Sequence, residues 1–384
     1  MRFSVFLFLV ASLLLSGCSD DDDADLYEPD PLVDIDNQFE IKTLWSTSVG
    51  DGIDDQALKI SPVFAYKKIY VADTTGKIVA INPDNGKQIW ESDFELAIAG
   101  GPAVASKIVV VGTLQGEVLA VDAETGKEKW RAQVSSEVIS SPAIGDGFVA
   151  VRTVDGKIYA FDAATGEQKW FYDESIPALT LRGNSSPVIA NGGVISGFSN
   201  GKLAVFVLSN GQIAWEKKIA TPIGSSEIQR LVDVDLQPLI VGSSIYIGAF
   251  NGNLAALDFR KGEFMWQREL STFQDMAVGD LFLFVTHENS HLSGVNRTNG
   301  VIIWTQKELN RRQLTAPGVV GDYLVVSDYE GYVHWLSKKT GKIVSREHID
   351  SSGIAATPLV IDDKVILYAR DGSLVAIEKE NNKK

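Results

Sequence analysis

The sequence contains few residues that could form disulfides, bind metals or carry redox chemistry. Among its 384 residues are one cysteine, four histidines and three methionines. A single cysteine cannot form an internal disulfide, which excludes redox chemistry between thiols of this chain. His287 and His291 are four residues apart, which corresponds to about 13 Å on an extended strand and is too far for one metal ion. The sequence therefore predicts no metal site.

Long apolar stretches and excess positive charge are also missing. The longest apolar stretch, residues 3–15, is shorter than the roughly 20 residues that a membrane-spanning helix needs. No long window has apolar residues at helical spacing, and 34 glycines, 12 prolines and many β-branched residues favour an all-β chain. The formal net charge of −15 argues against nucleic acid as a partner, because binding to phosphates requires a basic patch.

The first residues have the layout of a secretory signal, with Met-Arg followed by the apolar stretch. The Leu-Ser-Gly-Cys sequence at residues 15–18 resembles the bacterial lipobox. This resemblance implies that residues 1–17 are a lipoprotein signal peptide and that Cys18 is acylated, which anchors the chain to a membrane through lipid. Cys18 is followed by Ser19 rather than Asp, which in lipoproteins of the enteric type implies delivery to the outer membrane.

Residues 18–38 are predicted to be the acylated Cys18 followed by a flexible acidic tether. Residues 19–40 include ten Asp or Glu and no Lys or Arg. Such a block of like charges, interrupted by Pro29 and Pro31, repels itself and favours a solvated segment. We therefore expect the folded domain to comprise residues 39–384.

A repeat of about 40 residues follows the tether. Most units place proline, glycine and tryptophan at intervals of 14 residues, as in Pro62, Gly76 and Trp90. One degenerate unit keeps the spacing with Met276, Ser290 and Trp304, and another has Ser345 at the tryptophan position, so that eight units can be counted. The last unit begins at Pro358 and ends before its own tryptophan position, whereas Trp45 precedes the first unit. The tryptophan position of the later units is occupied by Trp130, Trp170, Trp215, Trp266 and Trp304.

This repeat predicts an eight-bladed β-propeller of four-stranded antiparallel blades. The residues after each repeat glycine are nearly all apolar, which is typical of a strand covered on both faces, and the period fits four short strands per blade. We expect the strand around Trp45 to pair into the last blade, so that the N-terminal strand closes the ring. The seven tryptophans are expected to pack on outer strands against the adjoining blade.

Two patterns in the sequence resemble enzyme motifs. Residues 197–201, Gly-Phe-Ser-Asn-Gly, match the G-x-S-x-G nucleophile motif, but that motif requires a strand-to-helix turn and this segment is expected to connect two strands. Residues 120–130 and 160–170 resemble the tryptophan-docking motif of the pyrroloquinoline-quinone dehydrogenases, which are also eight-bladed. Many of those enzymes hold the quinone with a vicinal disulfide and calcium, which the single cysteine of this chain cannot match. The sequence therefore predicts the fold of these enzymes without catalytic residues or a cofactor.

Variation in length is concentrated in the links from each tryptophan to the next repeat proline. Most links span 10 to 13 residues, but Trp170 to Pro187 spans 17 and Trp215 to Pro238 spans 23. The two long links belong to neighbouring blades, so we expect them side by side on one face. Because long loops on a rigid scaffold commonly carry function, residues 171–186 and 216–237 are predicted to form a recognition surface.

The long links also carry strings that resemble a known family. Together with the lipobox, the tether and the repeats, residues 179–183 (Leu-Thr-Leu-Arg-Gly) and 233–235 (Asp-Val-Asp) are similar to the BamB family, the lipoproteins of the β-barrel assembly machine. The resemblance implies a non-catalytic scaffold of the outer-membrane β-barrel assembly complex, held at the periplasmic face of the outer membrane of a Gram-negative bacterium. It implies docking on the periplasmic POTRA domains of BamA, with unfolded outer-membrane proteins as a further partner. The predicted partner-binding residues are Leu179, Leu181, Arg182, Arg230, Asp233 and Asp235.

Other functions fit part of the same sequence. A lipid-anchored periplasmic propeller could bind a saccharide or another small ligand, and this alternative predicts polar and aromatic side chains converging at the central channel. A degenerate quinoprotein is a further alternative.

Overall fold

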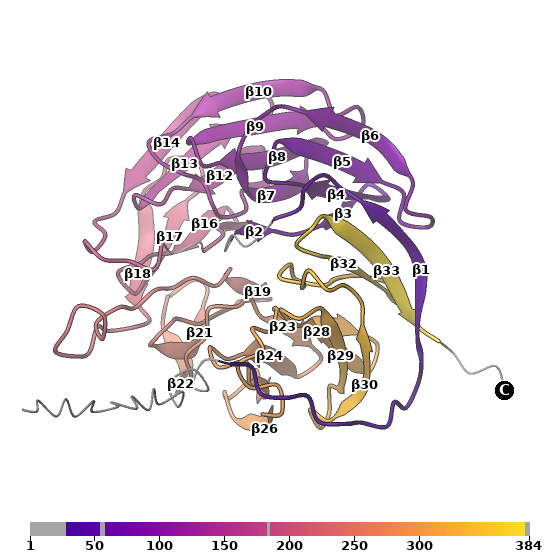
Figure 1. The fold of residues 1–384 in the computed structure, drawn as a ribbon. Helices are drawn as coiled ribbons and strands as arrows, with labels where there is room; N and C mark the ends of the chain where they lie inside the picture. Colours follow the sequence, from indigo (N-terminus) through magenta and orange to yellow (C-terminus); the bar gives the residue numbers. More distant parts are fainter. Residues whose placement is uncertain (1–27, 54–57, 183–184, 381–384) are drawn as a thin grey trace, which may run out of the picture.

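The computed structural model describes residues 28–53, 58–182 and 185–380. The predicted signal peptide and Cys18 lie outside the described residues, as does the acidic run before residue 28. The described chain consists of short strands that form eight sheets around a central axis (Figure 1). The predicted eight-bladed β-propeller of four-stranded antiparallel blades is confirmed. Among the described residues there is no helix that is both long and apolar enough to cross a membrane.

The blades follow one another along the chain, and each sheet runs from an innermost to an outermost strand. Blade 1 is formed by β3 (Val63–Ala65), β4 (Lys68–Ala72), β5 (Lys77–Ile81) and β6 (Gln88–Asp93). Blade 2 is formed by β7 (Ile98–Ala105), β8 (Ile108–Thr113), β9 (Glu117–Asp122) and β10 (Glu128–Gln133), and the two-residue β2 (Lys59–Ile60) pairs parallel with β7 as an additional strand. Blade 3 is formed by β11 (Ala143–Gly145), β12 (Phe148–Arg152), β13 (Lys157–Asp162) and β14 (Gln168–Asp173). Blade 4 is formed by β15 (Val188–Ala190), β16 (Gly193–Gly197), β17 (Lys202–Val207) and β18 (Ile213–Lys218).

The second half of the ring repeats this order. Blade 5 is formed by β19 (Leu239–Val241), β20 (Ser244–Ile247), β21 (Asn253–Asp258) and β22 (Phe264–Glu269). Blade 6 is formed by β23 (Ala277–Gly279), β24 (Phe282–Thr286), β25 (Leu292–Asn296) and β26 (Ile302–Gln306). Blade 7 is formed by β27 (Gly318–Val320), β28 (Tyr323–Ser327), β29 (Tyr332–Ser337) and β30 (Ile343–His348). Blade 8 is formed by β31 (Leu359–Ile361), β32 (Lys364–Tyr368), β33 (Ser373–Lys379) and, from the N-terminus, β1 (Ile41–Ser48).

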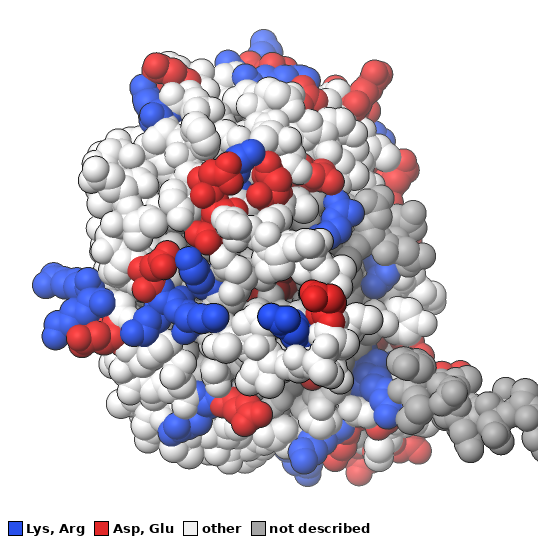
Figure 2. Space-filling model, turned by 90° about the vertical axis from the view of Figure 1, so that its left-hand side faces the viewer, with Lys and Arg blue, Asp and Glu red and all other residues white. Residues whose placement is uncertain are grey.

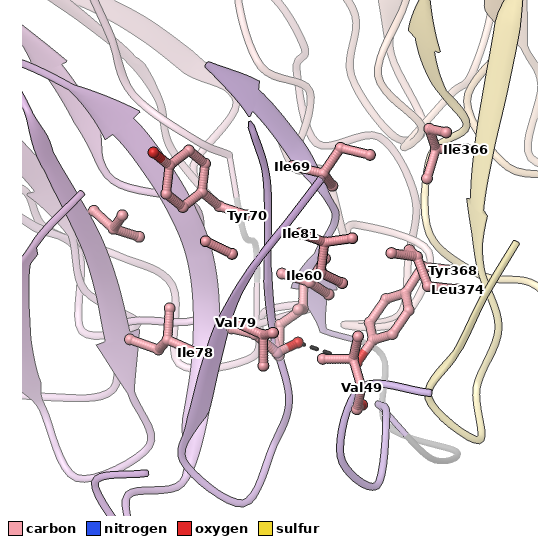
Figure 3. Packing of buried hydrophobic residues seen from close by; sticks show 14 of the residues in the cluster. Val49, Ile60, Ile69, Tyr70, Ile78, Val79, Ile81, Ile366, Tyr368 and Leu374 are labelled. Atoms are coloured by element: carbon pink, nitrogen blue, oxygen red, sulfur yellow. Dashed lines mark hydrogen bonds between the residues drawn. The ribbon is translucent and has the colours of Figure 1, made fainter. Parts of the chain in front are cut away.

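Burial along the strands explains the nearly continuous apolar runs. The third strand of blade 3, β13, has four buried residues in a row, whereas the outer strand β14 is mostly exposed apart from the buried Trp170 and the partly buried Tyr172. A strand in the middle of a blade is covered by the neighbouring blade on each face, so apolar side chains on both faces leave water. Figure 3 shows this packing between blades 1 and 8, where Ile69 and Ile81 face Ile366.

The N-terminal strand closes the ring as predicted. β1 pairs antiparallel with β33, from Ile41 opposite Lys379 to Ser48 opposite Ser373. Strand β33 is therefore covered on both edges, with β32 on its other side. This arrangement joins the two ends of the chain within one sheet.

Each of the seven repeat tryptophans connects its outer strand to the next blade through a hydrogen bond and through packing of its ring. Their indole N–H groups donate to a backbone carbonyl of the following blade at 2.7–3.2 Å, as from Trp170 to Leu208 and from Trp266 to Arg297. The rings lie on the turn glycines, which have φ between 66° and 73°. A Cβ atom at Gly211 would come within 2.6 Å of the ring of Trp170, so this turn needs glycine for both its φ and its space. The predicted packing role of the tryptophans is confirmed.

The junction between blades 7 and 8 lacks a repeat tryptophan, because Ser345 occupies that position. Its hydroxyl donates to the carbonyl of Phe39 at 2.6 Å. The ring of Phe39 packs edge-on against Trp335 and Tyr323, with ring centroids 5.5 and 5.1 Å away. An aromatic cluster therefore takes the place of a docked tryptophan at this junction.

A correction concerns the predicted flexible tether, since its described part, residues 28–38, lies on the propeller. We call this part the strap. Its backbone exchanges hydrogen bonds with blade 7 and the preceding link: Arg346 Nη1 donates to the carbonyl of Val33 at 2.9 Å, and Gln38 N–H donates to the carbonyl of Val344 at 2.8 Å. Leu32 and Ile35 pack against buried side chains of blades 6 and 7. The strap is bound because apolar side chains alternate with its acidic ones, a pattern that net charge alone conceals.

Candidate docking surface on the link face

The two long links lie on the same face of the ring, which we call the link face. Each leaves an outer strand, β14 or β18, and enters the innermost strand of the next blade, β15 or β19. The hydroxyl of Ser185, in the first link, donates to the carbonyl of Leu236, in the second, at 2.9 Å. The predicted proximity of residues 171–186 and 216–237 is thereby confirmed.

The first long link presents apolar side chains and an arginine to solvent. Leu179 and Leu181 are 45% and 42% exposed, and the side chain of Arg182 is 60% exposed. Arg182 has a φ of 55° and its N–H donates to the hydroxyl of Thr180 at 3.1 Å. An L-residue in this left-handed region is uncommon, so the backbone here holds the arginine in a defined direction. Its guanidinium pairs with Glu137 at 3.1 Å, on the neighbouring link.

Glu137 receives two hydrogen-bonding contacts that stabilise its ionised form. The hydroxyl of Ser136 and the guanidinium of Arg182 both lower the pKa of the Glu137 carboxyl, with the hydrogen bond from Ser136 as the larger cause. Because the ion pair is partly exposed, its contribution to stability is small. Its geometric effect is to orient Arg182 across the boundary between the two links.

The base of the first long link is fixed by a buried carboxylate. Glu174, only 7% exposed, accepts hydrogen bonds from Tyr172 at 2.9 Å and Asn200 at 2.7 Å, and Lys202 lies 3.4 Å away. Burial, followed by the contact with Glu174, raises the pKa of Tyr172 to about 12. These contacts tie the start of the link to blade 4, so that the exposed leucines stand on a rigid base.

The second long link contributes exposed residues that the sequence interpretation did not identify. Ile223 and Ile228 are 79% and 73% exposed. A single turn holds Ile228 in place, because Gln229 N–H donates to the Ser226 hydroxyl at 3.2 Å and the Gln229 side chain accepts from Ser226 N–H at 3.4 Å. This is the arrangement of a capping box. The Ser-x-x-Gln pattern of Ser226 and Gln229, which encloses Ile228, is the feature of the sequence that could have indicated this turn. Arg230, at the end of this turn, is exposed as expected.

Asp233 and Asp235 require a correction, because they are not at the surface. Asp233 is fully buried and Asp235 is 6% exposed. Residues 232–236 lie between blades 4 and 5, with Val234 buried in the core that blade 5 shares with blade 4. The backbone of Asp233 bridges to Phe250, whose N–H donates to its carbonyl at 2.8 Å. The segment is buried because its valines and leucine leave water, and the aspartates are carried inward with them.

The buried position changes the acidity of Asp233. Burial is the largest cause, followed by the negative charge of Asp235, and together they raise the pKa of Asp233 to about 7. The positive charge of Arg152 acts in the opposite direction. A carboxyl group in this setting titrates near neutral pH.

Charge on this side of the molecule is mixed in sign. Figure 2 shows the side that carries β14, β18 and β22, with Lys and Arg interspersed with Asp and Glu between broad uncharged areas. No continuous basic field is visible on the part of the described chain that faces the viewer.

The described residues around the cavity beside blades 1 to 4 do not form the cluster that the small-ligand alternative predicts. A cavity of about 320 Å³ lies at the axis, walled by the innermost strands of blades 1 to 4 and by Gln237. The described residues that line it are proline, alanine, valine, isoleucine, serine and glutamine, with neither aromatic nor charged side chains among them. Lys59 crosses the ring near this point and pairs with Asp275 at 3.2 Å. This part of the channel is therefore lined mainly by apolar groups.

The structure also shows where the motifs considered for catalysis and metal binding lie. Ser199, in the Gly197–Gly201 string, lies in the turn between β16 and β17, as expected, and is buried. His287 and His291 flank a turn with ring centroids 6.2 Å apart, so the expected separation of about 13 Å is wrong. A turn rather than an extended strand brings them together. Within the described ranges, no group of three or more His, Cys, Asp or Glu side chains could hold a metal ion.

Fold and repeat together define this chain as an eight-bladed propeller with tryptophan-docked, quinoprotein-type blades. A family model described as "Outer membrane protein assembly factor BamB" matches residues 41–95, 74–306 and 288–384. The BamB of Aliivibrio fischeri is 45% identical over 94% of each chain, and that of Escherichia coli is 37% identical over 97% of each. The chain belongs to the BamB family of outer membrane protein assembly factors.

Solved structures agree with this assignment. The crystal structure of BamB from Moraxella catarrhalis matches with a TM-score of 0.80 and 25% identity, covering 88% of this chain and all of that one. The quinohemoprotein alcohol dehydrogenase from Comamonas testosteroni matches with a TM-score of 0.70 at 13% identity, covering 91% of this chain and 78% of that one. The likeness to the dehydrogenase shows a shared fold alone. The relatives that share the sequence are described as assembly factors, which supports the non-enzymatic interpretation.

Proposed function

We propose that this chain is a non-catalytic scaffold of the outer-membrane β-barrel assembly complex, which docks on the periplasmic POTRA domains of BamA through the link face of blades 3 to 5. Membership of the BamB family supports the complex as the setting. The place of the proposed docking surface is supported by one observation: two adjacent long links carry exposed apolar side chains beside exposed arginines.

Four apolar side chains form the anchors of the proposed surface. Leu179 and Leu181 come from the first long link, and Ile223 and Ile228 from the second. Full burial of one such side chain by a partner is worth roughly 1.5–3 kcal/mol. Isolated exposed hydrophobic residues are common, but four on two adjacent links indicate a binding site.

Arg182 and Arg230 supply the polar part of the surface. Arginine is enriched in interface hot spots because its guanidinium makes several hydrogen bonds while its stem packs on apolar groups. Arg182 is already oriented by Glu137 and by its own backbone conformation. Pre-orientation reduces the entropy that a partner must remove on binding.

The remaining parts of the proposal concern the membrane. Acylation of Cys18 would hold the chain at the periplasmic face of the outer membrane, since more than one acyl chain gives stable residence in a bilayer. The scaffold would then assist the folding and insertion of outer-membrane proteins while it is bound to the assembly complex.

The test uses the double variant Leu179→Ala/Arg182→Ala in the full-length, membrane-anchored chain. We expect at least a tenfold loss of BamA co-purified from solubilised membranes, because one apolar anchor and one oriented charge are removed. The thermal unfolding midpoint should remain within about 2 °C, since both side chains are exposed.

The matched control is Leu281→Ala/Arg260→Ala, which removes an exposed leucine and an exposed arginine from hairpin turns of blades 6 and 5. These turns lie outside the two long links. The control should retain full co-purification of BamA. Equal retention by both double variants would move the interface away from the long links.

A further inference from the structure

The backbone at the end of the second long link, residues 235–237, is bound by side chains from three other links. Two of these side chains form an ion pair, in which Lys59 Nζ lies 3.2 Å from Asp275 Oδ1. Lys59 Nζ also donates to the carbonyl of residue 235 at 2.8 Å, and Asp275 Oδ1 accepts from the N–H of residue 237 at 2.7 Å. The third side chain is that of Ser185, which donates to the carbonyl of residue 236. We call residues 235–237 the link end.

The ion pair joins two distant parts of the ring on the link face. Lys59 is in the link between β1 and β3, where β2 pairs with Gly100 of blade 2. Asp275 is in the link between β22 and β23, which leads from blade 5 to blade 6. Only 20% of the Lys59 side chain and 28% of the Asp275 side chain are exposed, so water competes less for their hydrogen bonds than at an open surface. The pair therefore holds the link end between blade 2 and the link that enters blade 6.

The link end continues the segment that carries the exposed turn of the docking surface. Val232 and Val234, just before the link end, are buried in the core that blades 4 and 5 share. The turn with Ile228 and Arg230 precedes them in the chain. Hydrogen bonds inside the turn define its shape, whereas its place on the link face is set by the segment that follows. A shift of the link end and of this segment would therefore move the turn.

Ser185 connects the link end to the first long link. Its side chain is fully buried, as is that of Leu236, whose carbonyl accepts the Ser185 hydroxyl at 2.9 Å. Leu179 and Leu181 precede Ser185 on the same link. These leucines and the exposed isoleucines of the second link form one surface only while the two links keep this relative position.

We propose that Lys59 and Asp275 are positioning residues of the docking surface: their ion pair holds the link end, and with it the exposed turn, in the place relative to the first long link that the partner recognises. The inference rests on the proposed function. A partner then meets both links already in position, which reduces the entropy that binding must remove.

The contacts of the pair predict a graded effect of substitutions. Lys59→Met leaves the carbonyl of residue 235 and the Asp275 carboxylate without this donor in a largely covered place, so the link end should shift toward water and binding of BamA should weaken about fivefold or more. Asp275→Asn removes the ion pair, but its amide oxygen can still accept from the N–H of residue 237, so the loss should be about two- to threefold. Lys59→Arg keeps the positive charge and should bind better than Lys59→Met.

The double variant Lys59→Met/Asp275→Asn tests whether the two residues act as a pair. If each acts through the other, the second substitution adds no loss, and the double variant should bind as well as Lys59→Met within about twofold.

The experiment measures two quantities on the full-length chain. Titration against purified BamA in detergent reports binding, and amide hydrogen exchange of residues 234–237 in the chain alone reports how firmly the link end is held without a partner. This exchange should be about tenfold faster in Lys59→Met. The control is Lys364→Met, which removes an ion pair with Asp84 at 2.8 Å between hairpin turns of blades 8 and 1. It should leave both quantities within about twofold of wild type, because an exposed ion pair contributes little.

Wild-type binding by Lys59→Met would overturn the proposal, whether or not exchange at the link end changes. Weaker binding with unchanged exchange of residues 234–237 would also overturn it, because Lys59 would then act by another route. Additive losses in the double variant would show that the two residues act separately, which contradicts a joint positioning role.

Thermal melts identify a variant that fails to fold. If Lys59→Met does so, Asp275→Asn decides the question, and wild-type exchange and binding in that variant overturn the proposal. Leu179→Ala/Arg182→Ala separates this inference from the proposed function. If that double variant loses BamA while Lys59→Met keeps it, only the positioning role fails, whereas retention by both places the docking surface elsewhere.

Discussion

At the scale of single residues, burial has opposite consequences for the repeat tryptophans and for Asp233. Trp130 is 6% exposed, covers the turn at Gly166 and donates its N–H to the carbonyl of Ala163 at 3.0 Å. Its polar atom therefore has a partner, and the ring contributes its full apolar area. The carboxylate oxygens of Asp233 are buried without a hydrogen bond of normal geometry among the described residues, and the protonation of this carboxyl group changes near neutral pH.

The raised pKa of Asp233 predicts a loss of stability as pH increases. The folded chain holds the proton more tightly than the unfolded chain, so this contribution is fully present below about pH 4 and is lost as pH rises to the folded pKa of about 7. A shift of this size corresponds to a change on the order of 4 kcal/mol in the free energy of unfolding.

Urea unfolding at pH 5, 6, 7 and 8 measures the effect, with Asp233→Asn as the comparison. Burial lowers the pKa of His287 to about 4 and also lowers that of His334, and these groups make stability rise with pH up to about 6.5. The difference between wild type and variant isolates Asp233. A difference that stays constant from pH 5 to 8 would contradict the prediction.

At the scale of elements, the strap is held by two arginines that link it to buried charges. Arg312 Nη1 donates to the carbonyl of Asp30 at 3.1 Å, and its Nε pairs with the buried Asp328 at 2.7 Å. His334, also buried, lies between Asp328 and Arg346, with Nε2 2.9 Å from the carboxylate and Nδ1 accepting from Arg346 Nε at 3.1 Å. The strap is thus coupled to the interior of blade 7.

Arg346→Ala is expected to release the strap while the ring stays folded. The change removes the hydrogen bonds to Val33 and His334, and hydrogen bonds to charged groups contribute about 1.5–3 kcal/mol each. Amide exchange of residues 30–38 should become at least tenfold faster, whereas exchange in blades 1 to 5 should not change. Arg131→Ala, which removes exposed ion pairs of blade 2, serves as the control and should leave the strap protected.

The same elements show which features the sequence could predict. The ring, the docked tryptophans and the closing strand were predictable because each depends on residue types that recur at fixed spacing. The strap was not, since its acidic composition pointed to solvent while the deciding contacts come from Arg312 and Arg346, far away in the sequence. Burial of Asp233 and Asp235 was missed because alternating Val and Asp indicates a half-exposed strand, whereas the core that buries this segment is supplied by blades 4 and 5. Ile223 and Ile228 were overlooked because exposure of an apolar residue depends on the surrounding fold.

At the scale of the whole molecule, the ring depends on one non-covalent junction between the ends of the chain. Glu380 N–H donates to the carbonyl of Glu40 at 2.8 Å, which places the end of β33 beside the start of β1. Deletion of residues 39–48 would expose the edge of β33 and uncover Gly86, which Trp45 covers. We expect this deletion to prevent cooperative folding, because blade 8 loses its outer strand and its contact with blade 1.

A circular permutant separates the effect of the strand from the effect of its connection. Joining Glu380 to Glu40 through Asn-Gly makes β33 and β1 a hairpin, and new ends can be placed at the exposed turn between Gly321 and Asp322, where β27 meets β28. The permutant keeps β1 and should unfold in a single transition at or above the midpoint of a chain that begins at residue 39. The hairpin removes the loop-closure entropy of bringing distant ends together, so closure becomes a local event. A permutant that melts in two steps, or a deletion of residues 39–48 that melts like the intact chain, would show that the blades hold the ring together without the strand that joins its ends.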